Sequence, residues 1–206
     1  MKIKVFADTI CGWCYIGHSR LLKALSSFKD VSFDLEHGPF QLNPEMPKKG
    51  ISRLDYLKFK FGSKEAAKPM YDSMIAEALK ENLKFNIDKI QITPNTSLSH
   101  ILTKLAFSKK IGHQVISKIY NSYFSKGANI GDADILIEIG KSQNMSEKEI
   151  IDSFSSEVET NNINRSDNIA RNMGINGVPF LEINNKIYIS GAQSTDDLIE
   201  AIKVNL

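Results

Sequence analysis

The only two cysteines of this 206-residue chain stand three positions apart near its start, within Asp8 to Gly17, which reads DTICGWCYIG. The apolar stretch Ile3 to Ala7 before them predicts a strand, and the residues after them predict a helix. Two sulfurs three residues apart at a helix start lie close enough to bond, and the unpaired N–H groups there favour a thiolate at the first. The pattern predicts a dithiol redox site, with Cys11 as nucleophile and Cys14 as the resolving, protonated partner.

The alternative for a Cys-x-x-Cys pair is half of a zinc site, which needs four N or S ligands. Because there is no third cysteine, histidines would have to complete it. A non-enzymatic zinc-binding or chaperone-like module therefore stays open as the minor alternative. The candidate ligands would be His18, His37, His100 and His113.

A second redox signature lies far downstream, at Gly177-Val178-Pro179-Phe180. The pair Asn184-Asn185 between two short apolar runs predicts a two-residue hairpin, because Asn tolerates the positive φ that such turns require. Pro179 suits the first residue of a strand, and its peptide bond is the kind that can be cis at modest cost. A cis bond would present the backbone of Val178 to an extended substrate, whereas the alternative is an ordinary trans proline that ends a loop.

These stretches together resemble the DsbA-like branch of the thioredoxin superfamily and, within it, the FrnE-like oxidoreductases. The segment Trp13 to Gly17 and the Gly-Ala-Gln close point to this branch, and the resemblance spans nearly the whole chain. One departure is Gly12, where members often carry proline. The matching stretches are Asp8 to Gly17, Pro39 to Pro44, Asn95-Thr96 with His100, Gly177 to Phe180, and Gly191-Ala192-Gln193.

The resemblance implies a thiol–disulfide oxidoreductase whose partner is a thiol or disulfide, either a protein or a small molecule. It implies no bound organic cofactor, with glutathione as a candidate co-substrate. A glutathione-dependent isomerase or transferase, as in relatives similar to 2-hydroxychromene-2-carboxylate isomerase, is a second alternative, although those relatives typically carry serine in place of Cys11. Beside the catalytic Cys11 and Cys14, the expected substrate-binding residues are Gly12, Trp13, Val178, Pro179 and His100.

The apolar spacing predicts an α/β thioredoxin fold with a large all-helical insertion. A helix from Cys14 to about Phe28 is followed by a strand that starts at Val31 and ends with Glu36 and His37, whose side chains are expected to be solvated. The chain closes with the hairpin and a helix capped by Ser194. The expected domains are 1–42 with 174–206, and an insertion of 43–173. Its helices are expected near 54–61, 64–83, 98–109, 113–124 and 135–140, then after Ser146 and before Gly174.

Composition is that of an ordinary globular chain, with 42% hydrophobic and 24% charged residues. The net charge of +2, from 26 basic and 24 acidic residues, gives no reason to expect nucleic acid as a partner. No segment has the long apolar run of a signal peptide or a membrane span. The expectation is therefore a cytoplasmic protein with no membrane partner. In a reducing compartment, a cysteine pair is more plausibly catalytic or metal-bound than a static crosslink.

Overall fold

A four-stranded sheet lies at the centre of the computed structural model, which describes all 206 residues. The strands are β1 (Lys2–Ala7), β2 (Asp34–Pro39), β5 (Phe180–Ile183) and β6 (Ile187–Ser190), and their order is β2-β1-β5-β6. β1 pairs in parallel with β2 and antiparallel with β5, which pairs antiparallel with β6. The predicted α/β thioredoxin-like fold with a helical insertion is confirmed.

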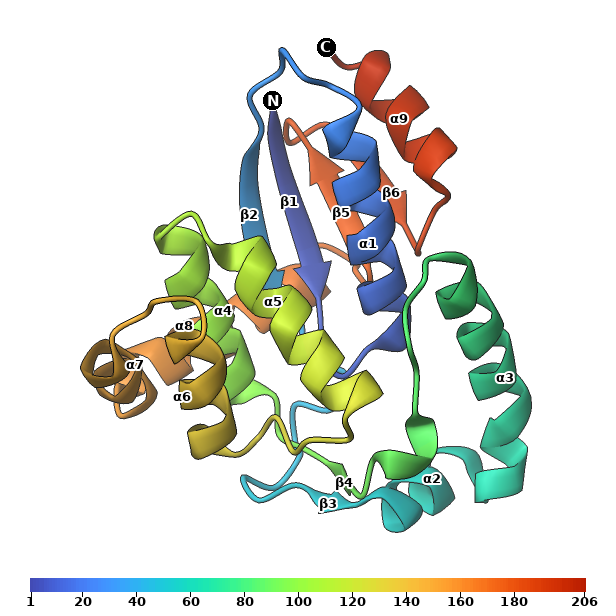
Figure 1. Cartoon of the computed structure of the whole chain (residues 1–206), viewed down its shortest axis with the longest axis vertical. Coiled ribbons are helices and arrows are strands. Elements are labelled where there is room, and N and C mark those ends of the chain that lie inside the picture. Colours follow the sequence, from blue (N-terminus) through green and yellow to red (C-terminus); the bar gives the residue numbers. More distant parts are fainter.

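Two helices cover one face of this sheet. Helix α1 (Gly12–Ser26) follows β1, and α9 (Thr195–Lys203) closes the chain and packs beside α1 (Figure 1). Both chain ends lie at the same end of the molecule, whereas β1 runs away from them toward the insertion (Figure 1). The apolar side chains buried between the helices and the sheet are Ile3, Leu21, Ala24, Leu181, Ile183, Leu198 and Ile202.

Strand β2 begins three residues later than the sequence pattern indicates, so the prediction of a strand that starts at Val31 and ends with Glu36 and His37 is wrong in its bounds. β1 begins at Lys2, whose partner in β2 is Asp34, and the pairing continues to Ala7 opposite Pro39. Residues before Asp34 therefore have no strand to pair with, and Phe33 instead packs its ring edge-on against Phe28. β2 continues to Pro39, so His37 lies inside the strand instead of at its end and is partly buried rather than solvated.

The hairpin and the helix caps follow the sequence signals closely. Asn184 and Asn185 both have positive φ, 51° and 57°, although the connection also includes a third residue, because Ile183 pairs with Ile187. The Ser194 hydroxyl accepts a hydrogen bond from the Asp197 N–H at 3.1 Å and so begins α9. Gly174, with φ 83°, follows the end of α8 as predicted.

The segment between the two halves of the sheet is almost entirely helical, as predicted. Two short antiparallel strands within it, β3 (Ile51–Ser52) and β4 (Ile92–Thr93), were not predicted, because two residues cannot show a strand periodicity. A 3₁₀ turn, Ile87–Lys89, and a π-helical turn, Asn121–Ser125, connect helices. The helices are α2 (Arg53–Phe61), α3 (Lys64–Lys80), α4 (Ser97–Ser108), α5 (Gly112–Tyr120), α6 (Ala133–Lys141), α7 (Glu147–Phe154) and α8 (Glu157–Asn172).

The largest hydrophobic core joins the end of β1 to the insertion. It contains Ala7 and both cysteines together with insertion residues such as Leu102 and Ile150. Tyr120, also fully buried, stacks its ring on Tyr15 at 5.0 Å. This core contains residues from both expected domains. The division into a domain of 1–42 with 174–206 and an inserted domain of 43–173 therefore stays a prediction. None of the helices combines the length and apolar character needed to cross a lipid bilayer.

A cluster of ionic hydrogen bonds fixes α3 against α1. The guanidinium of Arg20, in α1, donates to Glu77 of α3 at 2.6 Å and to Glu81, the C-cap residue of that helix, at 2.7 Å. It also donates to the backbone oxygen of Ala192, at 2.8 Å, which ties the C-terminal segment to the same point. Burial opposes the charge of Arg20, and the two carboxylates outweigh it, so the pKa of Arg20 is raised.

We expect Arg20→Ala to lower the free energy of unfolding by about 3 kcal/mol, because the mostly buried carboxylate of Glu81 then loses the guanidinium that compensates its charge. Chemical denaturation monitored by circular dichroism measures this loss. The matched control is Lys64→Ala, which breaks an exposed pair with Asp88 and should cost less than about 1 kcal/mol. Equal losses in the two variants would show that the Arg20 cluster contributes no more than a surface pair.

Candidate redox site

Cys11 is the N-cap residue of α1, in the position that the sequence predicts for the nucleophile. Its backbone is extended, with φ −88° and ψ 112°, and its Sγ accepts a hydrogen bond from the N–H of Cys14 at 3.2 Å. Its own N–H donates to the backbone oxygen of Asp8 at 3.1 Å. The sulfur therefore lies where the helix dipole and an unpaired N–H group stabilise negative charge.

Cys14 lies one turn into α1 and has almost no exposed surface, 1% against 7% for Cys11. Both thiols are free. Burial raises the pKa of the Cys14 thiol well above its ordinary value, and the hydrogen bond and charge of Cys11 raise it further. Cys14 is thus held as a thiol while Cys11 reacts, which agrees with the predicted order of the two steps.

The distant proline loop lies against the sulfur pair. The Val178–Pro179 peptide bond is cis, and the Cys11 Sγ contacts the backbone oxygen of Val178 at 3.5 Å. β5 begins directly after this proline and pairs with the end of β1, with Phe180 opposite Phe6. The sheet register thereby brings together two segments that are 167 residues apart in the sequence.

A glycine of α1 receives the proline ring. A Cβ at Gly17 would lie 3.0 Å from the Pro179 ring and 3.5 Å from the Ala192 side chain. The N–H of Gly191 donates to the backbone oxygen of Pro179 at 2.8 Å. The stretch Gly191-Ala192 thus completes the packing around the cis-proline. The sequence analysis did not assign it this role. The only sequence signal for it is that both residues are small.

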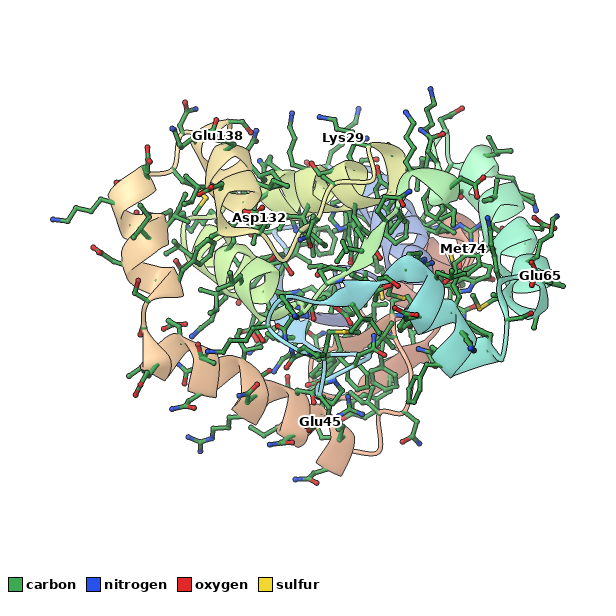
Figure 2. The ribbon with its side chains drawn as sticks, turned by 90° about the horizontal axis from the view of Figure 1, so that it is seen from below. Lys29, Glu45, Glu65, Met74, Asp132 and Glu138 are labelled. Atoms are coloured by element: carbon green, nitrogen blue, oxygen red, sulfur yellow. The ribbon has the colours of Figure 1, made fainter.

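Gly12, between the cysteines, is covered by the helical insertion. A Cβ on Gly12 would lie 2.1 Å from the Met74 sulfur and 3.0 Å from the Phe85 ring. Met74 is on the side of α3 that faces the rest of the molecule, whereas Glu65 lies on its outer side (Figure 2). Trp13, the other intervening residue, packs against the core that contains the cysteines and keeps part of its surface exposed.

His100 does not occupy the substrate-lining position expected of it. It is fully buried in α4, where its Nε2 lies 3.3 Å from the carboxylate of Asp8 and its Nδ1 lies 3.1 Å from Nε2 of His37. It therefore lies in the interior, in contact with Asp8, which stands three residues before Cys11. The position of Asp8, three residues before Cys11 at the end of a buried strand, is the sequence signal that could have identified this carboxylate.

The remaining histidines are occupied in packing. His18 shares a hydrogen bond with the Ser117 hydroxyl at 2.8 Å, and burial together with the nearby His113 lowers the pKa of His18 to about 3. Its ring also stacks on that of His113 at 5.5 Å. Nowhere do three or more His, Cys, Asp or Glu side chains come together as a possible metal site, so the donor set for the zinc alternative is not assembled.

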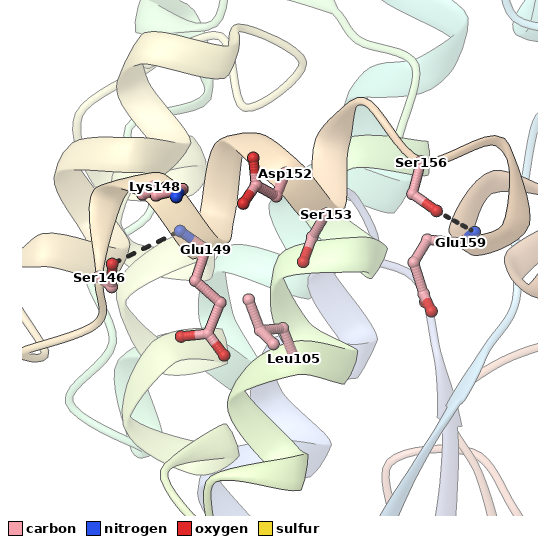
Figure 3. A pocket seen from close by; sticks show the side chains of 8 residues that line it. All are labelled: Leu105, Ser146, Lys148, Glu149, Asp152, Ser153, Ser156 and Glu159. Atoms are coloured by element: carbon pink, nitrogen blue, oxygen red, sulfur yellow. Dashed lines mark hydrogen bonds between the residues drawn. The ribbon is translucent and has the colours of Figure 1, made fainter.

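A polar cavity of about 450 Å³ lies away from the cysteines, between α4 and the α7–α8 region (Figure 3). Two of its carboxylates are paired with lysines, Glu149 with Lys109 at 2.8 Å and Glu159 with Lys104 at 2.6 Å. Two of its serines are helix N-caps: Ser146 accepts from the N–H of Glu149, and Ser156 from the N–H of Glu159 (Figure 3). The cavity contains no thiol or imidazole and is unsuited to redox chemistry.

Comparison with known proteins agrees with this geometry. The family model of the DSBA-like thioredoxin domain matches residues 2–203. The uncharacterized protein YwbO of Bacillus subtilis is 25% identical over 141 residues, which cover 68% of this chain and 65% of that protein, slightly less than two thirds of its length.

Solved structures share the fold over nearly the whole chain. A probable DsbA oxidoreductase of Streptomyces coelicolor, SCO1869, superposes with a TM-score of 0.88 at 24% identity, covering 99% of this chain and 89% of that one. The cytosolic disulfide reductase DsbM of Pseudomonas aeruginosa, solved with GSH, has a TM-score of 0.71 at 17% identity and coverages of 100% and 98%. A 2-hydroxychromene-2-carboxylate isomerase has a TM-score of 0.72 at 12% identity and coverages of 100% and 94%.

We expect Gly12→Ala to lower the free energy of unfolding by about 1 to 3 kcal/mol, because the added methyl group displaces Met74 from a filled core. Guanidinium titration of the variant measures the change. Met74→Ala makes room for the methyl group, so the double variant should lose less than the sum of the two single losses. Strict additivity of the two losses would contradict a direct contact between Gly12 and Met74.

Proposed function

Because this chain belongs to the family of DSBA-like thioredoxin domains, we propose that it is a thiol–disulfide oxidoreductase working through the dithiol of Cys11 and Cys14. The observation that carries the proposal is the position of the Cys11 sulfur. It lies at the N-terminus of α1, within contact distance of both the Cys14 N–H and the Val178 backbone oxygen. A nucleophile, its resolving thiol and a backbone edge for the substrate are thus within one turn of each other.

The proposed reaction begins when the Cys11 thiolate attacks one sulfur of a substrate disulfide. A mixed disulfide forms, and the other substrate sulfur leaves as a thiolate. Cys14 then loses its proton and attacks the Cys11 sulfur, which releases the second substrate thiol and leaves Cys11 bonded to Cys14. The same steps in reverse oxidise a dithiol substrate.

The residues around the sulfur pair fit a substrate segment that approaches along the proline loop. Gly12 and Trp13 border Cys11 on one side, and Val178 and Pro179 border it on the other. We assign substrate contact next to the reacting sulfur to the backbone at Val178 and the apolar surface of Trp13, whereas the buried Gly12 and Pro179 shape the site without being exposed to the substrate. His100 is excluded from direct contact by its burial.

The proposed partner is a protein or small-molecule thiol, with glutathione as a candidate co-substrate and no bound organic cofactor. Support for a reducing compartment comes from DsbM, which is described as a cytosolic disulfide reductase and was solved with GSH. We therefore propose a cytoplasmic location. The isomerase alternative is weaker, because the nucleophilic cysteine is present here.

Cys11→Ser should reduce turnover in a disulfide-reduction assay to the uncatalysed rate, because the serine hydroxyl is a far weaker nucleophile at neutral pH. Cys14→Ala should instead stop after the first attack and accumulate a mixed disulfide, visible by intact mass spectrometry in cell extract. The mass added to Cys11 would identify the substrate, and glutathione alone would indicate a small-molecule partner. Unchanged turnover in Cys11→Ser would remove the redox assignment.

Alkylation should distinguish the two thiols. We expect iodoacetamide to modify Cys11 in the folded dithiol protein and to modify Cys14 only after unfolding, because burial raises the pKa of Cys14 and covers its sulfur. Peptide mass spectrometry after timed quenching measures both rates. Equal modification of the two cysteines in the folded protein would contradict the assigned order of nucleophile and resolving thiol.

A further inference from the structure

Arg53, the first residue of α2, is a partly buried cation whose hydrogen-bonding partners carry no charge. Its Nη2 donates to the hydroxyl of Tyr71 at 2.6 Å, and its Nη1 donates to the hydroxyl of Thr93 at 3.2 Å. Its Nε is buried and has no hydrogen-bonding partner among the groups of the protein. Arg20, by contrast, is paired with two carboxylates. Arg53 therefore lacks the anionic partner that a buried cation usually has.

Two aromatic rings flank the guanidinium of Arg53 and orient it. Its central carbon lies 5.4 Å from the ring centre of Tyr56 and 5.1 Å from that of Tyr71. Burial is the main influence on the Tyr71 hydroxyl and raises its pKa, although the charge of Arg53 acts in the opposite direction. The hydroxyl therefore keeps its proton, and its oxygen accepts from Arg53, so this proton is free to be donated. A guanidinium has five N–H donors, and unused donors next to a positive charge suit a carboxylate.

Helices α1 and α3 run side by side in the same direction (Figure 1). The start of α1 meets α3 at Gly12, where an added Cβ would lie 2.1 Å from the Met74 sulfur. Further along, Arg20 of α1 donates to Glu77 of α3 at 2.6 Å. A residue that precedes Met74 on this face of α3 therefore lies in front of the first turn of α1.

Tyr71 occupies that position in front of α1. It comes three positions before Met74, so both side chains are on one face of the helix, with Cβ atoms about 5 to 6 Å apart. Tyr71 packs against the core that contains Cys11 and keeps part of its surface exposed. Helix α2, which begins with Arg53, lies farther in this direction, at the end of the molecule opposite to the chain termini (Figure 1). The Cys11 sulfur, the Tyr71 hydroxyl and the Arg53 guanidinium thus follow one another in front of α1.

The aspartates in the walls of the neighbouring cavities are already paired with lysines. Arg53 lines a cavity of about 160 Å³, and Tyr71 lines an adjoining cavity of about 400 Å³. The pairs are Lys64 with Asp88 at 3.4 Å and Lys68 with Asp72 at 2.6 Å. Glu65, which also lines the larger cavity, lies on the outer side of α3 (Figure 2). The positive charge of Arg53 therefore stays uncompensated.

We propose that Arg53, oriented by Tyr71, binds a carboxylate of the substrate, so that the dithiol favours low-molecular-weight disulfides carrying a carboxylate over neutral ones. The inference rests on the proposed function and names the substrate class for the same site. A guanidinium can bind a carboxylate through two parallel N–H···O bonds. The small exposed fraction of Cys11, 7%, and the cover of Gly12 by Met74 favour a small disulfide over a folded protein surface. Glutathione, the candidate co-substrate, has two carboxylates and belongs to this class.

The cation contributes to binding and leaves the chemical step unchanged. The Cys11 thiolate attacks one substrate sulfur, the substrate S–S bond breaks, and the other sulfur leaves as a thiolate with the electron pair. Cys14 then loses its proton to solvent and attacks Cys11, which releases the second substrate thiolate. The dithiol loses two electrons, and the substrate disulfide gains them. Because the carboxylate keeps its charge throughout, the loss of Arg53 should raise KM more than it lowers kcat.

The test compares disulfides that differ in charge, with the reduced full-length protein in a stopped-flow fluorimeter. Trp13 is the only tryptophan of the chain and lies between the cysteines, so its fluorescence reports the oxidation of the dithiol. The substrates, each in excess over protein and below saturation, are oxidised glutathione, the same compound with all its carboxylates esterified, and the neutral 4,4′-dithiodipyridine. We expect the wild-type protein to react faster with oxidised glutathione than with its ester.

Arg53→Gln should slow the reaction with oxidised glutathione by on the order of 10- to 100-fold, the range that a hydrogen bond to a charged group contributes. The ester and 4,4′-dithiodipyridine should keep their rates, because neither offers a carboxylate. Lys68→Gln, which removes the same charge from an exposed pair, is the matched control and should leave all three rates unchanged. An unchanged ratio of the two glutathione rates in Arg53→Gln, or an equal fall with all three disulfides, would overturn the inference.

Arg53→Lys provides a second test in case Arg53→Gln does not fold. Lysine keeps the charge but loses the planar pair of donors, so the rate with oxidised glutathione should fall several-fold while 4,4′-dithiodipyridine keeps its rate. Equal losses with both disulfides would show a structural role and overturn the inference. If the wild-type protein reacts with none of the three disulfides, the proposed function itself fails. Normal reaction with 4,4′-dithiodipyridine but no preference for oxidised glutathione over its ester contradicts the carboxylate site alone, so the two failures are distinguishable.

Discussion

The placement of the Cys11 sulfur at the first turn of α1 is the constraint on which the rest of the site depends. Its Sγ accepts the Cys14 N–H, so the same atom begins the helix and is the candidate nucleophile. A neutral thiol sulfur is a weaker hydrogen-bond acceptor than the oxygen of Ser or Asp. A thiolate sulfur is a better acceptor than a neutral thiol, because it is charged. Helix capping and nucleophilicity therefore favour the same charged form.

The sheet determines what can reach that sulfur. Only four residues, Asp8 to Cys11, connect β1 to α1, so the start of the helix is held at the end of β1. The antiparallel register of β5 on β1 brings Val178 to the same end, directly before the cis-proline. A shift of one residue in this pairing would turn the side chains of β5 to the opposite face and separate the loop from the sulfur. The redox geometry is therefore a consequence of strand register.

Local signals in the sequence predicted much of this structure, and long-range contacts account for what they missed. Caps such as Ser194 and the positive φ of Asn184 depend on a few neighbouring residues, so their elements were predicted within one or two positions. The start of β2 was misplaced because it depends on where β1 begins. The burial of His100 depends on how α4 packs against β2, and no periodicity reports that contact.

The same distinction applies to the residues of the site. The Cys-x-x-Cys pair and the Val-Pro step were recognisable because each is a short contiguous pattern. Met74 and Arg20 were not recognisable, because the partner of each lies more than 50 positions away in the sequence. Arg20 and Glu77, for example, are 57 positions apart. In a single sequence, such contacts show only as small residues with no local reason for their size, such as Gly12 and Gly17.

Helix α3 shows why the motif and the insertion must be considered together. Met74, Glu77 and Glu81 recur at spacings of three and four, so they share one face of the helix, and that face meets α1 from Gly12 to Arg20. The insertion thus supplies one wall of the redox site and is tied to it by charge. A proline at position 12 would add a ring where the Met74 sulfur now packs. Gly12 and Met74 therefore form one unit, and a change in the dithiol motif requires a matching change on α3.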